Sequence, residues 1–454
     1  MFDHYSTEPV FNVKAIAHQT GVAAATLRAW ERRYGVPSPP RTDSGYRLYS
    51  AKDVAIIRWL KGQVDNGMSI SQAVQLLNLI ATHSANSHSS DKLPREHVPS
   101  SYQRLHDDIV SAAVEFDEVH IESALSEAFS LFSVEDVCLH VVQPVLQSLG
   151  RLWHSGEITV SVEHFASNLI RRKMLTLMTS SPAPTRNTRI VAACAPGEYH
   201  ELGMLMLSLF LRRQGYNVVY LGQNIAATRL QEMLAKTQPD LLLLSASSLL
   251  SAANLLDVCC DLRDTSVHTG LTIAFGGRVF NRLPVLEKRV PGQYIGEDAG
   301  QAMNRIMEVI ANARGAAHGA QLATAINDLA QPADPVSAKA LAAFRLCRAD
   351  IVSATVRMTA THAGGGYSGR QAFETAENLV DVVDAVLRFG EPEILAQFVN
   401  WQWEALPPDG LGASHLKVFA GAMADATRSV MSEPLVVGVL PYLHALEKGF
   451  ETEV

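Results

Sequence analysis

Two kinds of run alternate along the chain from about residue 183 to residue 312. Short, almost continuous apolar runs are separated by longer segments in which apolar residues recur at helical spacing. Continuous apolar runs are typical of strands buried on both faces, so this alternation predicts a doubly wound parallel sheet with helices between its strands. The five expected strands are Arg189–Ala195, Asn217–Leu221, Asp240–Ser245, Leu271–Phe275 and Gln293–Ile295.

Helical spacing without strand-like runs marks the two segments that flank this region. Residues 101–180 contain few helix breakers, and apolar residues recur with a helical period from Val114 through Val119 to Leu152. This pattern predicts a four-helix bundle. Residues 338–454 also favour an all-helical segment, with breaks at 364–366, 407–408 and Pro434.

The N-terminal pattern indicates a small helical module. Asn12–Thr20 predicts a short helix ended by Gly21, and Ala24–Arg33 predicts a second helix. Two short helices joined by a glycine-containing turn fit a helix-turn-helix. The module is expected to continue with a β-ribbon over Pro37–Tyr49 and with helices that begin at Asp53 and Ser69.

These patterns together predict a multidomain chain. Residues 81–100 are rich in Ser, His, Asn and Pro and favour a flexible linker. The expected parts are a helix-turn-helix module (1–80), the linker (81–100), a helical bundle (101–182), an α/β domain (183–312), a second linker (313–337) and an all-helical domain (338–454).

Composition narrows the class of protein. The chain has 454 residues, of which 47% are hydrophobic, yet it lacks an uninterrupted apolar run long enough for a membrane span. Its N-terminus lacks the pattern of a signal peptide, and its five cysteines have no CxxC spacing. We therefore expect a cytoplasmic protein with reduced thiols and no contact with a membrane.

The charge is unevenly distributed. The formal net charge is −8, which argues against a chain that binds nucleic acid over its whole surface. Between residues 11 and 62, however, nine Lys/Arg accompany only three Asp/Glu. A local positive excess on an acidic protein is the footprint expected of a small DNA-binding module.

Candidate cofactor chemistry lies where the first expected strand of the α/β domain ends. Glu198-Tyr-His200-Glu-Leu-Gly203 stands between that strand and an apolar helix. A neutral imidazole is a good ligand for a transition metal, and a carboxylate two residues away can accept its other N–H. Gly203 would let a bulky group approach the backbone. Taken alone, a histidine beside a glutamate in a loop is more often just solvated.

Spacing strengthens the metal-ligand interpretation. Residues 204–244 separate Gly203 from Ser245-Ala-Ser247, and residues 248–275 separate that tripeptide from Gly276-Gly277. The series resembles the Asp-x-His-x-x-Gly, Ser-x-Leu/Thr and Gly-Gly pattern of cobalamin-binding domains. Glu198 replaces the aspartate and Ser247 replaces the leucine or threonine. The resemblance implies a Rossmann-like cobalamin domain with His200 as the lower axial ligand of cobalt.

The basic N-terminal module resembles the winged helix-turn-helix of MerR-type regulators. The similarity rests on Thr26-Leu-Arg-Ala-Trp-Glu-Arg-Arg-Tyr-Gly35 and Ser44-Gly-Tyr-Arg-Leu-Tyr49. Leu27 and Trp30 are expected in the core of the module, while Arg28 and Arg32 would share an outer face. The resemblance implies that Ala24, Thr26 and Arg28 lie near base edges and that Arg41, Tyr46 and Arg47 contact phosphates.

The bundle carries a second cobalamin signature. Trp153, nine residues, then Glu163-His164 resembles the helical cap of the CarH/LitR group of MerR-type, light-responsive regulators. The resemblance implies that Trp153, a large and rigid apolar lid, covers the adenosyl group, which Glu163 and His164 also contact. It also implies that His154 can bind cobalt from above after the adenosyl group is lost. The alternative is that Trp153 is bundle core and His154 is an exposed helix end.

The C-terminal domain departs from this group. Phe398-Val-Asn-Trp401-Gln-Trp403, with His362, His415 and His444, could line a pocket. The segment faintly resembles globin-like modules that hold a bilin. The alternative is a packing or oligomerisation bundle, because a lone helical histidine is usually not a ligand.

The resemblances imply a transcriptional repressor that uses adenosylcobalamin to sense light. In the dark it would form a tetramer on double-stranded promoter DNA, and light would cleave the cobalt–carbon bond and lower DNA affinity. One rival is a regulator whose C-terminal domain senses cobalamin or another tetrapyrrole, a bilin or heme. A cobalamin enzyme is a weaker rival, since the chain has no room for a substrate barrel of about 250 residues.

Overall fold

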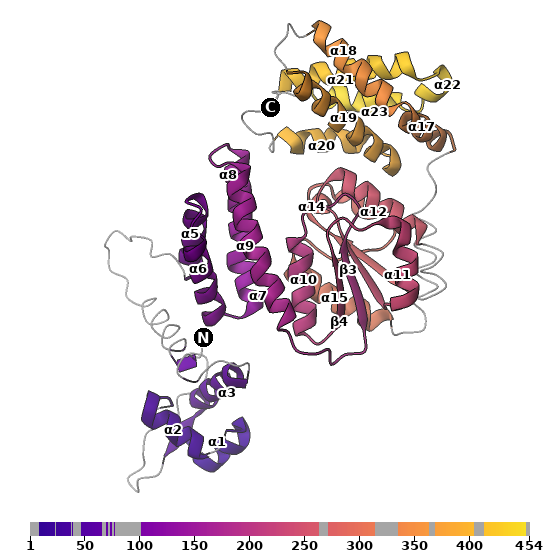
Figure 1. The fold of residues 1–454 in the computed structure, drawn as a ribbon. Coiled ribbons are helices and arrows are strands. Elements are labelled where there is room, and N and C mark those ends of the chain that lie inside the picture. Colours follow the sequence, from indigo (N-terminus) through magenta and orange to yellow (C-terminus); the bar gives the residue numbers. More distant parts are fainter. Residues whose placement is uncertain are drawn as a thin grey trace. The chain divides into compact units, whose positions relative to one another are not determined.

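The computed structural model describes most of the chain outside its linkers (Figure 1). By contacts the chain divides into two compact units. One unit comprises residues 1–105 and 122–137, and the other comprises residues 106–121 and 138–454. The described residues are 9–22, 24–37, 39, 47–65, 70, 73–74, 77, 101–262, 271–313, 335–362, 368–403 and 413–450.

The N-terminal module forms the expected helix pair. The side chain of Asn12 caps α1 (Val13–Thr20), and Gly21, with φ of 67°, ends it. After α2 (Ala24–Tyr34), the strand β2 (Leu48–Ser50) leads into α3 (Ala51–Asp65). The end of the predicted ribbon pairs antiparallel with β1 (Pro9–Asn12), a strand that the sequence pattern did not predict because four residues are too few to show alternation.

The predicted bundle segment is helical throughout. Its succession is α5 (Ser101–Val114), α6 (Glu118–Leu131), α7 (Val134–Val137), the π-helix η1 (Cys138–Val142), α8 (Gln143–His154) and α9 (Val160–Thr179). Val119, placed on the apolar face by its spacing, is instead 76% exposed. It stands in the first turn of α6, beside the turn that follows α5, where side chains have few neighbours.

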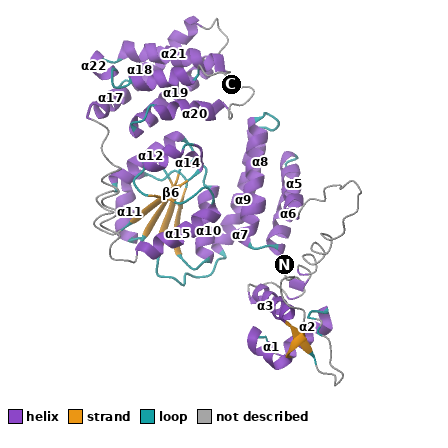
Figure 2. Cartoon of the chain, turned by 180° about the vertical axis from the view of Figure 1, so that it is seen from behind, coloured by secondary structure: helices purple, strands orange, loops and turns teal. Residues whose placement is uncertain are grey.

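The α/β domain has the doubly wound parallel sheet that the sequence predicts (Figure 2). The strands lie in the order β4-β3-β5-β6-β7, all parallel. Each begins and ends within about one residue of its predicted bounds. They are β3 (Arg189–Cys194), β4 (Asn217–Gly222), β5 (Leu241–Ser245), β6 (Thr272–Gly276) and β7 (Gln293–Tyr294).

Helices cover both faces of this sheet, which explains why its strands are apolar throughout. On one face, α10 (Leu202–Arg213) and α15 (Ala299–Ala313) pack on β3 and its neighbours. On the other, α11 (Leu230–Thr237) and α12 (Leu249–Asp261) do so. Short turns of helix complete the domain: η2 (Ala227–Arg229), α14 (Arg278–Arg282) and η3 (Pro284–Lys288).

Every described element of the C-terminal domain is a helix, as predicted, and the predicted breaks at 364–366 and 407–408 lie outside the described residues. Pro434 stands in the first turn of α22, where its missing N–H costs nothing. Buried residues of these helices join the hydrophobic core on the α12 side of the sheet. The helices are α17 (Pro335–Leu346), α18 (Arg348–His362), α19 (Gly369–Phe389), α20 (Glu393–Trp403), α21 (Ala413–Val430), α22 (Glu433–Val436) and α23 (Leu440–Gly449).

Candidate functional site

The carboxyl ends of β3 and β5 lie side by side in the sheet. The chain leaves β3 toward α10 on one face and leaves β5 toward α12 on the other, so the strand order reverses between these neighbours. Ligands of open α/β sheets bind at such switch points, outside the carboxyl ends of the strands. The loop of Glu198 and His200 follows β3, and Ser245 ends β5. The structure therefore brings the first two sequence motifs to one place.

Glu198 orients the imidazole of His200. Nδ1 of His200 lies 2.7 Å from Oε1 of Glu198, which also accepts the backbone N–H of His200 at 2.7 Å. Because the carboxylate only accepts, Nδ1 carries the proton and Nε2 is left as the site for a metal. The side chain of His200 is 80% exposed, whereas that of Glu198 is 1% exposed.

The buried carboxylate of Glu198 remains ionised because it is fully hydrogen-bonded. Its second oxygen accepts the backbone N–H of Ser247 and, at 2.8 Å, the hydroxyl of Ser251. Burial alone would raise the pKa of Glu198, but the hydrogen bonds from His200 and Ser251 outweigh burial and lower it. The hydrogen bond to Glu198 in turn raises the pKa of His200.

Ser245 offers an unused polar group at the carboxyl end of β5. Its hydroxyl oxygen is buried and finds no hydrogen-bond partner of good geometry among the described residues. The nearby thiol of Cys194, whose pKa burial raises to about 12, is only a weak partner. A buried polar group without a partner costs free energy unless a ligand satisfies it. Ser245 is therefore suited to receive a polar ligand atom.

Two glycines leave room at the site for different reasons. Gly277 has φ of 120°, and a Cβ there would lie 2.0 Å from the carbonyl oxygen of Ala246. Only glycine lets the end of β6, with its neighbour Gly276, pass so close to the end of β5. Around Gly203, in the first turn of α10, a Cβ would meet nothing within 4 Å. That position borders open space.

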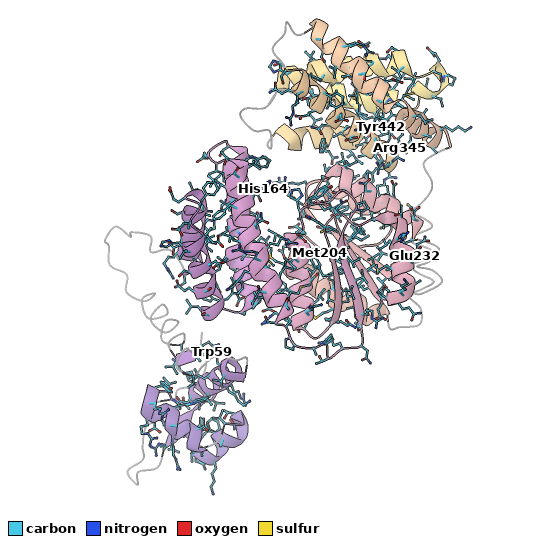
Figure 3. The ribbon with its side chains drawn as sticks, viewed as in Figure 1. Trp59, His164, Met204, Glu232, Arg345 and Tyr442 are labelled. Carbon is cyan, nitrogen blue, oxygen red and sulfur yellow. The ribbon has the colours of Figure 1, made fainter. Side chains whose placement is uncertain are left out.

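The residues of the predicted cap lie at the end of α8 and the start of α9. The rings of Trp153 and His154 are 4.7 Å apart, and Trp153 is 36% exposed rather than bundle core. Nδ1 of His164 lies 2.8 Å from the carboxylate of Glu163, and Figure 3 marks His164 on α9. The hydrogen bond to Glu198 and, to a smaller degree, the charge of Glu163 raise the pKa of His200. α9 lies beside the His200 loop, because Arg171 on α9 donates to Glu201.

Sequence reasoning missed three residues that hold this loop. Glu201 accepts Nε–H of Arg171 from α9 and the hydroxyl of Tyr220 from β4, each at 2.5 Å. Ser251 and Asn254, on α12, contact Glu198 and the backbone of Pro196. The Ser248-x-x-Ser251 capping box is visible in the sequence, but nothing there shows which loop Ser251 would reach.

The DNA-binding candidates on α2 are accessible. Arg28 and Arg32 are exposed, Ala24 and Thr26 are half-buried, and Leu27 and Trp30 are buried in the module's core as expected. Nε of Arg47 donates to Glu31 at 2.7 Å. The other two candidates, Arg41 and Tyr46, lie outside the described residues.

The structure describes the side chains of two of the three candidate C-terminal histidines. His415 on α21 and His444 on α23 are both exposed, and the side chains of His362, Trp401 and Trp403 lie outside the described residues. A cavity of about 460 Å³ lies between α18 and α21 instead. Its lining consists of Ala354, Arg357, Met358, Ser429 and Val430.

No helix in the described part of the chain is both long and apolar enough to cross a membrane.

Comparison with known proteins agrees with the geometry. Residues 11–80 match the family model of MerR HTH regulatory proteins, and residues 105–178 and 188–306 match two family models described as B12 binding domains. A solved structure, the monomethylamine corrinoid protein of Methanosarcina barkeri, aligns at 19% identity over 46% of this chain and 98% of that one. Its TM-score of 0.38 is too low to support an inference.

The alignments with two curated relatives span most of the length of each relative. The HTH-type transcriptional repressor CarH of Myxococcus xanthus is 32% identical over 60% of this chain and 89% of its own. The repressor CarA of the same organism is 34% identical over 51% of this chain and 75% of its own. The chain therefore belongs to the CarH and CarA family of B12-binding, MerR-type transcriptional regulators.

Proposed function

We propose that this regulator is a repressor that holds adenosylcobalamin and responds to light. The observation that carries the proposal is the pair of Glu198 and His200, in which a buried carboxylate fixes the proton on Nδ1 and leaves Nε2 on an exposed ring. The repressor names of both relatives support the direction of regulation.

Residues at the ends of β3, β5 and β6 and at the start of α10 would contact different parts of the cofactor. His200 would bind cobalt from below through Nε2, and the buried hydroxyl of Ser245 would donate to the nucleotide tail. The backbone at Ser247 and Gly276-Gly277 would line the tail, while the open space at Gly203 would admit the bulky ring system.

The cap residues would make the site respond to light. Adenosylcobalamin supplies a cobalt–carbon bond that light breaks. Trp153 is partly exposed and would pack on the adenosyl group, with Glu163 and His164 contacting it from α9. Without the adenosyl group Trp153 would lack its packing partner, and His154, whose ring lies beside that of Trp153, would be the residue that could then hold cobalt.

DNA affinity would then follow assembly. We propose that the dark form is a tetramer bound to promoter DNA through the N-terminal modules, and that light separates the protomers. A single small module binds DNA weakly, so the loss of multivalency lowers affinity by itself. The exposed arginines Arg28 and Arg32 would meet the DNA, together with Arg41, Tyr46 and Arg47.

The decisive experiment reconstitutes the full chain with adenosylcobalamin in the dark and illuminates half of the sample with green light. Gel filtration should show a larger assembly in the dark, and the illuminated protein should bind promoter DNA more weakly. Equal size and equal affinity in both samples would contradict the light switch. Methylcobalamin in a parallel sample would test whether the adenosyl group is required.

A variant tests the metal assignment separately. His200→Ala should abolish the spectrum of histidine-bound cobalamin and loosen the cofactor, because no other residue at this loop offers an imidazole to cobalt. His415→Ala is a matched control at an exposed histidine of the C-terminal domain. An unchanged spectrum in His200→Ala would overturn the ligand assignment. We propose no second tetrapyrrole site, since both described C-terminal histidines are exposed.

A further inference from the structure

Arg388 of the C-terminal domain is hydrogen-bonded to the α/β domain. Arg388, in the last turn of α19, donates from Nη1 to the side-chain oxygen of Asn254 at 2.6 Å and to Asp257 at 3.1 Å. Both partners lie on α12. The side chain of Arg388 is nearly buried, whereas that of Asp257 is 51% exposed.

Asn254 is also hydrogen-bonded to the loop that precedes His200. Its amide nitrogen donates to the carbonyl oxygen of Pro196 at 2.8 Å. The guanidinium of Arg388 can only donate, so it fixes the oxygen of Asn254 toward α19 and the amide nitrogen toward Pro196. A Cβ at Gly197 would lie 3.1 Å from that nitrogen, so the loop fits closely against Asn254.

α12 also contacts this loop through a residue one turn earlier in the helix. Ser251 donates to the buried carboxylate of Glu198 at 2.8 Å, three residues before Asn254 on the same helix face. The face of α12 therefore meets the loop on both sides of Gly197. A shift of α12 would move Pro196 and Glu198 together, and Glu198 orients His200.

Arg388 is itself held firmly within the C-terminal domain. Its Nε donates to Asp384 at 2.8 Å, and Arg345 donates to the other oxygen of Asp384 at 2.7 Å. Arg345 also lies 4.0 Å from Asp257, but it has no bond to Asn254. Arg345 therefore shares the interface without sharing the path to the loop.

We infer that Arg388 and Asn254 are positioning residues for the His200 loop, so that the C-terminal domain and the cobalamin site are energetically coupled. The inference rests on the proposed role of His200 as a cobalt ligand. Coupling of this kind is reciprocal: a change in the C-terminal domain alters cobalamin retention, and cobalamin alters the C-terminal domain. The C-terminal domain would thus be a second input to the same site.

The first test needs no cofactor. Hydrogen exchange of the full-length apo-protein is measured at the amides of Gly197, Glu198 and His200 in the wild type, Arg388→Gln, Asn254→Ala, the double variant and Arg345→Gln. Arg388→Gln and Asn254→Ala should each speed exchange at these amides by about tenfold, the loss expected for one charge-assisted hydrogen bond. The double variant should not exceed the larger single effect, because both act on one path.

Arg345→Gln is the matched control. It removes an ion pair from the same interface and should leave exchange in the loop unchanged. The inference would be overturned if Arg388→Gln and Asn254→Ala left the loop exchange rates unchanged. It would also be overturned if Arg345→Gln and Arg388→Gln had equal loop exchange rates, or if the effects of the two substitutions were additive in the double variant.

The second test uses adenosylcobalamin in the dark. Release of the cofactor should be several-fold faster in Arg388→Gln and Asn254→Ala than in Arg345→Gln, with a weaker spectrum of histidine-bound cobalt. Release and spectra equal to those of Arg345→Gln would overturn the coupling while leaving the proposed function intact. If the wild type fails to bind cobalamin, the proposed function falls and the coupling to the cobalamin site falls with it. The exchange measurement then still decides whether α19 orders the loop.

Discussion

At the residue scale, glutamate in place of aspartate at position 198 changes which residues the carboxylate contacts. The resemblance places aspartate at this position, and the longer side chain here extends to Ser247 and Ser251 at the start of α12 while still holding His200. Four donors meet one carboxylate. The bonds keep it ionised in a buried place, where an unpaired charge would be very costly.

The two site glycines should separate stability from cofactor binding. Gly277→Ala forces a Cβ onto the Ala246 carbonyl at a positive φ, so we expect a loss of about 3 kcal/mol or more in unfolding free energy. Gly203→Ala meets open space within a helix and should leave apo-protein stability unchanged or slightly higher. It should nevertheless weaken cobalamin binding. Thermal unfolding and cobalamin titration measure the two effects, and equal melting temperatures of the two apo-variants would contradict this account.

At the scale of elements, α9 and α12 hold the His200 loop from different sides. Arg171 on α9 binds Glu201 just after His200, and Ser251 on α12 binds Glu198 just before it. Each helix belongs to a different predicted part of the chain, so a movement of either one reaches the same loop.

Adjacent arginines on α9 give a test of this arrangement. Arg171→Leu leaves the buried carboxylate of Glu201 with one partner fewer, and we expect a loss of about 1 kcal/mol in unfolding free energy, reduced by the partial exposure of Arg171. Arg172→Leu breaks an exposed pair with Glu118 and should have an effect near zero. Urea unfolding of both variants decides the point, and equal losses would mean that the bond to Glu201 adds nothing.

The ion pairs of α19 predict a pH dependence. Burial would raise the pKa of Asp384, but Arg345 and Arg388 outweigh it and lower the pKa below the ordinary 3.8. The carboxylate therefore stabilises the fold fully above about 3.8, and this contribution is lost as the pH falls through the lowered folded-state pKa. Asp384→Asn should cost about 3 kcal/mol at neutral pH, with a difference from the wild type that shrinks below that pH.

Circular dichroism during urea unfolding at several pH values measures this difference. Asp425→Asn, at an exposed pair with Arg428, is the control and should match the wild type throughout. A deficit in Asp384→Asn that stays constant down to the lowest pH would contradict the assignment of the lowered pKa to Asp384.

At the scale of the whole molecule, charge and cofactor chemistry are segregated. The positive excess lies between residues 11 and 62 of a chain with net charge −8, while the candidate cobalamin residues lie between 153 and 277. We therefore expect DNA binding to depend on residues 11–62, and we expect the cofactor to affect DNA binding through assembly or domain arrangement.

Salt dependence checks the DNA part directly. Arg32→Ala, at an exposed arginine of α2, should lower the slope of log affinity against log salt by about 0.9 on a random-sequence duplex, the value for one lost phosphate contact. Arg305→Ala, which removes an exposed arginine paired with Glu308 on α15, should leave the slope unchanged. Matching slopes for the two variants would remove Arg32 from the DNA interface.

The sequence by itself determined the element types and the order of the parts, because buried parallel strands and amphipathic helices differ in their hydrophobic period. It also indicated a candidate cofactor-binding loop, since Glu198, His200, Ser245 and Gly277 stand at characteristic spacings along the chain. Only the tertiary structure decided which side chains support that loop. Arg171 and Asn254 are 83 residues apart in sequence, and Asn254 and Arg388 are 134 residues apart. Arg171 and Asn254 contact the loop, and Arg388 contacts Asn254, only after α9, α12 and α19 have packed. Local periodicity carries no information about such contacts, because they depend on how helices pack rather than on how each one forms.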